Sequence, residues 1–112
     1  MSAFQIIHDA QLAQSLATSA ERGCDILNID WRDITQQSDA LALLAQRADF
    51  PDYFGGNLDA LYDVLSERVD VLQTWLIRST PAQEKLLFPI LDTMRDALSA
   101  DGDLTVLWWL NV

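Results

Sequence analysis

Residues 51–65 read P-D-Y-F-G-G-N-L-D-A-L-Y-D-V-L, a glycine-rich aromatic turn that runs directly into an amphipathic helix. The Asn57 side chain can accept hydrogen bonds from the free N–H groups of the first helical turn, which makes it a good N-cap. Leu58, Leu61 and Leu65 recur at helical spacing and predict a buried stripe. The turn and the helix together form the most informative segment of the chain.

The exposed face of this helix carries two acids. Asp59 and Asp63 are four residues apart, so on a helix they are neighbours that repel each other by a few tenths of a kcal/mol. No Lys or Arg follows within the next turn of that face to offset the repulsion. Such a face is typical of a surface shaped for a cationic partner. The alternative is a solvated polar face without a partner.

Composition points the same way. The chain has 112 residues, of which half are apolar, and this predicts one domain with one core. Seventeen acids against seven bases give a formal charge of −10. This charge argues against binding to nucleic acid, whose phosphates need Lys and Arg, and against anionic membranes. It favours a basic protein partner, although excess charge can also serve solubility alone.

Cysteine usage and hydropathy indicate the cellular compartment of the protein. Cys24 is the single cysteine, so an internal disulfide is impossible. With His8 as the sole histidine, a buried structural thiol is the better interpretation than a catalytic one. No secretory signal pattern or membrane-spanning apolar run is present. We expect a cytoplasmic protein.

Strands and helices alternate along the chain. Strands are expected at 4–7, 25–31, 71–78 and 104–110, separated by helices that include one ended by Pro51 and one broken or restarted by Pro89. Adjacent residues on a strand face opposite sides, so Trp108 and Trp109 predict a sheet covered on both faces. His8, Trp31 and Trp75 are assigned to packing. The fold class is α/β, a small three-layer fold with a mostly parallel three- to four-stranded sheet and helical crossovers.

Catalysis and metal binding are weaker interpretations of the acids. Hydrolytic carboxylates need a concave site with unequal environments, which two neighbours on a convex helix face rarely supply. No nucleotide-binding loop is present to bring magnesium. The turn 101–103 lacks the glutamate that a calcium loop needs at its twelfth position, where Val112 stands. We expect no catalytic residue, no metal and no cofactor.

Residues 51–63 resemble the signature of the barstar family, P-x-Y-[YF]-G-x-N-L-D-A-L-[WY]-D, without gaps. A weaker resemblance extends from about Leu27 to Val106. Barstar-type proteins are small α/β inhibitors that block a secreted guanyl-specific ribonuclease inside the producing cell. Their helix and the turn before it plug the nuclease active site. The resemblance therefore implies an inhibitor and not an enzyme.

The resemblance also assigns roles to the acidic residues. Asp63 falls where the family's dominant carboxylate occupies the phosphate-binding pocket of the nuclease. Asp59 matches a second acid that faces basic residues of the nuclease. Asp96 matches an acid on the last helix that faces the nuclease edge. A carboxylate aimed at a phosphate pocket imitates substrate charge and pairs with Arg or Lys there.

The turn before the helix and its aromatic side chains are matched as well. Tyr53 matches an aromatic residue that stacks on the catalytic histidine of the nuclease. Tyr62 stands where the family has Trp, and such amphipathic side chains often anchor interfaces. The rest of the turn and the helix start corresponds to Phe54, Gly55, Asn57 and Leu58. Gly55 and Gly56 also have a structural interpretation, because a turn that needs a positive φ favours glycine.

Two features depart from the family pattern. Residues 1–24 extend beyond its usual start and are expected to add a strand and a helix at one sheet edge, or alternatively to mediate contact with something else. Arg68 lies near where the family has an aromatic residue, and a positive charge there would repel a basic nuclease. We predict a single barstar-like domain over residues 1–112, a monomer that inhibits a basic, barnase-like ribonuclease. The alternative is an interaction or regulatory module that binds another basic protein with the same helix.

Overall fold

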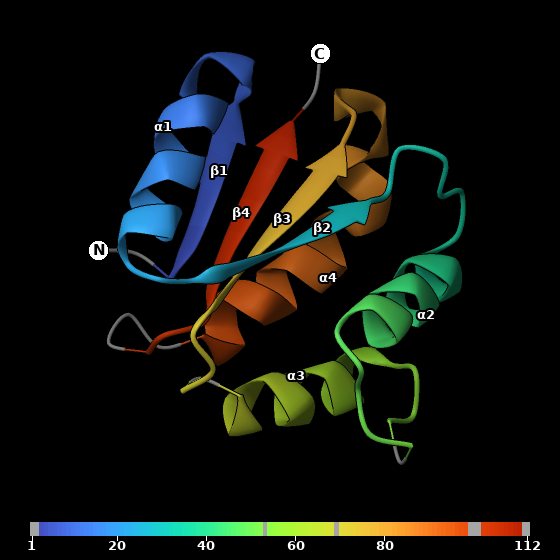
Figure 1. Ribbon diagram of the computed structural model, residues 1–112. Coiled ribbons are helices and arrows are strands. Elements are labelled where there is room, and N and C mark those ends of the chain that lie inside the picture. Colours follow the sequence, from blue (N-terminus) through green and yellow to red (C-terminus); the bar gives the residue numbers. More distant parts are fainter. Residues whose placement is uncertain (1–2, 53, 69, 99–101, 111–112) are drawn as a thin grey trace.

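The computed structural model describes residues 3–52, 54–68, 70–98 and 102–110, which form a sheet between helices (Figure 1). In chain order the elements are β1 (Phe4–His8), α1 (Asp9–Glu21), β2 (Asp25–Asp30), α2 (Gln37–Arg47), α3 (Leu58–Glu67), β3 (Gln73–Ser79), the 3-10 helix η1 (Pro81–Gln83), α4 (Glu84–Ala97) and β4 (Thr105–Leu110). Within these residues the sheet has four parallel strands in the order β1-β4-β3-β2. The predicted α/β class with a parallel sheet is confirmed.

The main core lies on the face of the sheet covered by α2, α3 and α4 (Figure 1). Trp31 and Trp75 are fully buried there, as predicted for packing residues. Trp75 lies opposite Leu27 on β2 and Val106 on β4, so the indole sits near the middle of this layer. The core holds α3 by its apolar stripe and leaves the other side of that helix to solvent.

A smaller cluster lies on the opposite face of the sheet, under α1. It consists of buried side chains from β1, β3 and β4 with half-buried partners from α1 and β4: Ile7, Leu76, Leu107, Leu12, Leu16 and Trp109. Trp108 belongs to the main core and Trp109 to this cluster, as the strand alternation predicted. The molecule therefore has three layers. No helix among the described residues is long and apolar enough to cross a membrane.

The segment between α2 and α3, residues 48–57, shapes the entry to α3. The helix α2 ends at Arg47, four residues before Pro51, so the predicted helix end at the proline is wrong. Asp49 adopts φ 53°, and the N–H of Phe50 donates to the carbonyl of Ala45 at 2.9 Å. This is the left-handed ending common at helix C-termini. It turns the chain before the proline is reached.

Two further expectations need correction. Proline was expected to break or restart the last helix, but α4 continues through Pro89. The helix persists because Leu87, Ile90 and Leu91 are fully buried on either side of it, and their burial outweighs the cost of about 3 kcal/mol for an internal proline. His8 was assigned to packing but is exposed at the start of α1, where its N–H donates to Oε1 of Gln11 at 2.9 Å.

Candidate functional site

The helix α3 begins directly after Asn57, the N-cap that the sequence predicts. Oδ1 of Asn57 accepts a hydrogen bond from the N–H of Ala60 at 2.8 Å, which satisfies one of the free donors of the first turn. Leu61, Val64 and Leu65 are buried, and this apolar stripe fixes the rotation of the helix about its axis. The remaining side of α3 is therefore turned outward.

The outward side carries the two acids predicted to bind a partner. Asp59 and Asp63 are both exposed, and neither forms an ion pair with another described residue. Tyr62, between them, is 45% exposed, which is high for a side chain of its size. We call Asp59, Tyr62 and Asp63 the acidic face. It presents two uncompensated carboxylates beside an amphipathic ring.

Two arginines, at the ends of α2 and α3, donate to backbone carbonyls and not to the acids of this face. Nε of Arg47 donates to the carbonyl of Asn28 at 3.1 Å. The guanidinium of Arg68 donates to the carbonyls of Ala48 and Asp49 at 2.6 and 2.8 Å. Arg47 is exposed and Arg68 is half-buried, and neither forms an ion pair with Asp59 or Asp63.

The turn before α3 is only partly a surface feature. Phe54 is half-buried, and its ring packs edge-on against Phe50, with centroids 5.0 Å apart. Gly56 has φ 71°, whereas the φ of Gly55 is not positive, so a left-handed conformation requires glycine at Gly56 alone. Gly55 is exposed, and a Cβ there would lie 3.4 Å from Nδ2 of Asn57. Tyr53 lies outside the described residues.

Sequence reasoning missed the contribution of α2 to this surface. The start of α3 and the start of α2 border a hollow of about 350 Å³ lined by Gln37, Ser38, Leu41, Gly56, Asn57, Leu58 and Asp59. Leu58 is half-buried beside it. Contacts between two segments twenty residues apart leave no periodic signal in the sequence. The hollow is a recess next to the convex acidic face, and Asp59 belongs to both.

Asp96 lies on a different element. It is exposed near the end of α4, next to the ion pair of Arg95 with Asp92. The helices α3 and α4 pack against each other in the same layer (Figure 1). Asp96 is thus carried by the helix beside the acidic face. Among the described residues, no three His, Cys, Asp or Glu side chains are grouped as metal ligands.

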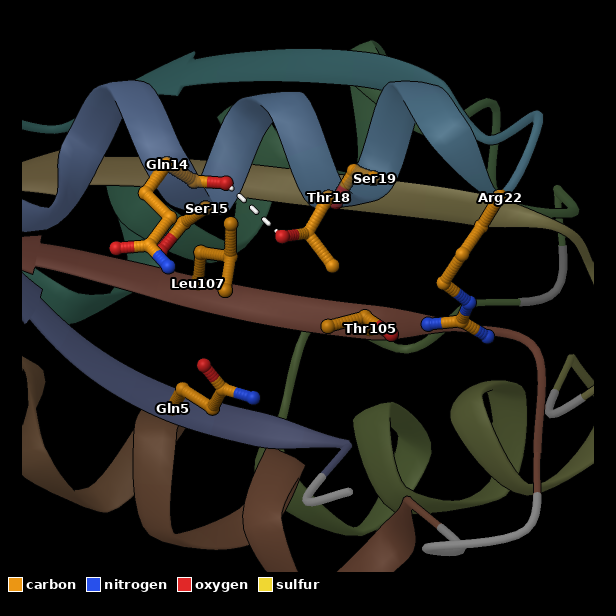
Figure 2. A pocket seen from close by; sticks show the side chains of 8 residues that line it. All are labelled: Gln5, Gln14, Ser15, Thr18, Ser19, Arg22, Thr105 and Leu107. Atoms are coloured by element: carbon orange, nitrogen blue, oxygen red, sulfur yellow. Dashed lines mark hydrogen bonds between the residues drawn. The ribbon is translucent and has the colours of Figure 1, made fainter.

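A second hollow, of about 220 Å³, lies on the other side of the sheet. It is bordered by α1, β1 and β4 and is lined by Gln5, Gln14, Ser15, Thr18, Ser19, Arg22, Thr105 and Leu107 (Figure 2). Thr18 donates to the backbone carbonyl of Gln14 at 3.0 Å. None of the lining residues is acidic, so this hollow is separate in position and in charge from the acidic face.

Comparison with known proteins identifies the family. The family described as Barstar (barnase inhibitor) matches residues 24–111. A protein of Bacillus subtilis (strain 168) named "Putative ribonuclease inhibitor YrdF" is 41% identical over 51 residues, which are 46% of this chain and 56% of that protein. The match thus covers little more than half of the relative's length. With the parallel sheet and the exposed α3 already described, the family match shows that this chain belongs to the barstar family.

Proposed function

We propose that this protein is an inhibitor that occludes the active site of a basic, guanyl-specific ribonuclease with α3 and the turn before it. The observation that carries the proposal is the exposed pair Asp59 and Asp63, which no described cation neutralises. The family description as a barnase inhibitor supports a ribonuclease as the partner. The protein acts by binding and is not an enzyme.

The roles are those that the resemblance to the barstar family implies, and the exposure of the acids supports them. Asp63 enters the phosphate-binding pocket of the nuclease, where Arg or Lys pairs with it by charge-assisted hydrogen bonds. Asp59 faces the surrounding basic residues and contributes to electrostatic steering of the encounter. Tyr62 anchors the edge of the contact, and Asp96 extends the negative surface onto α4.

The compartment and the assembly belong to the same proposal. The free thiol of Cys24 is buried, which fits a reduced cytoplasmic environment. A one-to-one complex of a monomer with the nuclease accounts for the role of the acidic face without a second copy. In this arrangement the inhibitor protects the cell that makes the nuclease.

The experiment is inhibition of purified barnase, used as a probe nuclease, by the wild-type protein and by Asp63→Ala. Wild type should inhibit stoichiometrically, and Asp63→Ala should not inhibit at the same concentration. Failure of both to inhibit, together with Asp63-dependent capture of another basic protein from the native organism, would replace the nuclease with a different basic target. Equal inhibition by both would refute the assigned role of Asp63.

A further inference from the structure

The sequence position of Arg68 suggests a charge that repels a basic nuclease, but its side chain makes its contacts elsewhere. Arg68 is the C-cap of α3, close in sequence to the acidic face, yet its half-buried side chain reaches back to the end of α2. Nη1 donates to the carbonyl of Ala48 at 2.6 Å and Nη2 to that of Asp49 at 2.8 Å. The last carbonyls of a helix lack partners within it and carry partial negative charge. Ala48 is the C-cap of α2 and Asp49 follows it, so a guanidinium fork suits these two neighbouring carbonyls.

The same guanidinium also contacts an aromatic stack. Cζ of Arg68 lies 5.0 Å from the centroid of the Phe50 ring, within range of a cation–π interaction. Phe50 in turn packs edge-on against Phe54, with centroids 5.0 Å apart, and lies 6.0 Å from Trp75. A continuous set of contacts therefore links Arg68 to Phe54, the residue directly before the glycines that lead into α3.

The segment held by these contacts has an unusual backbone. Asp49 is a non-glycine residue at φ 53°, a conformation that persists when the surroundings enforce it. Arg68 binds the carbonyl of this residue. Two backbone hydrogen bonds complete the turn, from the N–H of Phe50 to Ala45 and from the N–H of Phe54 to Pro51, both at 2.9 Å. These two amides report directly on the order of the segment.

We propose that Arg68 is a positioning residue that holds residues 48–52 and 54–56 in the conformation in which α3 meets its partner. The inference rests on the proposed function for its consequence in binding, but not for its structural content. A segment ordered before binding loses less entropy on association, which chiefly slows dissociation. The guanidinium of Arg68 donates to two carbonyls and forms no ion pair that the described residues show. Its charge therefore serves the structure of the segment before α3.

The structural content can be tested without a partner. Amide hydrogen exchange of Phe50 and Phe54 should be about tenfold faster in Arg68→Met than in wild type, because the two hydrogen bonds of the fork are lost. Arg68→Lys keeps the charge but has a single donating nitrogen in place of the two of the fork, and its exchange should lie between the two. Arg22→Met removes the same charge at the end of α1 and should change neither amide. Unchanged exchange of Phe50 and Phe54 in Arg68→Met would overturn the proposal.

Binding kinetics with barnase as the probe separate positioning from simple charge. If Arg68 acted through its charge alone, Arg68→Met would associate faster with a basic nuclease and dissociate at the wild-type rate. The proposal predicts instead that Arg68→Met dissociates about tenfold faster than wild type. Arg22→Met is the charge-matched control. If wild type does not bind barnase, the nuclease proposal fails, while the exchange experiment still decides the role of Arg68.

Discussion

Asp63→Ala is the substitution on which the proposed function depends most directly. The side chain is exposed and forms no ion pair with a described residue, so truncation leaves no cavity and no unpaired buried group. It relieves repulsion from Asp59 of a few tenths of a kcal/mol, and alanine is the better helix former by up to about 0.7 kcal/mol. The free energy of unfolding should therefore stay the same or rise by up to about 1 kcal/mol.

The effect on binding should be far larger and of opposite sign. Removal of one partner of a charge pair buried in an interface costs about 2–5 kcal/mol, partly because the other charge is left unpaired. That corresponds to a Kd raised about 30-fold to several thousand-fold. Inhibition of barnase gives the Kd, and urea denaturation gives the free energy of unfolding. Asp103→Ala, which removes an exposed acid from the turn before β4, is the charge-matched control.

Two results would refute this reasoning. A Kd for Asp63→Ala within about threefold of wild type, under conditions where wild type inhibits, would exclude Asp63 from the interface. A clear loss of folding stability would mean that the carboxylate makes an internal contact, and any loss of inhibition would then have a structural cause. An equal loss of affinity in Asp103→Ala would assign the effect to net charge and not to the acidic face.

Three further outcomes follow from the same structure. Raising the salt concentration from about 0.01 M to about 1 M shortens the Debye length from about 30 to about 3 Å, so the association rate with a basic nuclease should fall steeply while unfolding changes little. Leu61→Ala, at a fully buried position of α3, should cost about 2–5 kcal/mol of folding stability in urea denaturation. The hydrogen-bonded Arg32 holds the pKa of Asp30 below its usual value. A lowered pKa gives stability that is present above the unfolded pKa and lost as pH falls through the folded one, so Asp30→Asn should lose less stability on acidification than wild type.

The sheet was predictable because its signals are local. Alternating strand and helix patterns require parallel strands with helical connections, and the structure has them. The opposite facing of Trp108 and Trp109 follows from strand geometry alone. Asn57 as the N-cap of α3 is equally local, since one side chain meets an N–H three residues later. Each of these features is encoded within a few neighbouring residues.

The features that escaped prediction depend on contacts distant in sequence. Arg68 donates to carbonyls about twenty residues earlier. Its position in the sequence, close to the acids, predicted repulsion of a basic nuclease, whereas in the structure its guanidinium binds the end of α2. Pro89 has a local tendency to break a helix, which the buried packing of α4 overrides. The recess formed with Ser38 and Leu41 at the start of α2 likewise depends on how two helices are brought together.

The two faces of the sheet have different roles in the molecule, because one packs against α1 and the other carries α3. On one side, α1 covers Leu76 and Leu107, and β1 pairs along β4 from Phe4 to His8, so β4 is not left as an open edge. On the other side, the main core holds α3 with its acids outward. The sheet separates α1 from α3 (Figure 1). Because α1 packs on the opposite face of the sheet, we expect the described residues before the family match at 24 to influence partner binding through folding stability, whereas Arg68, as proposed, orders the segment before α3 directly.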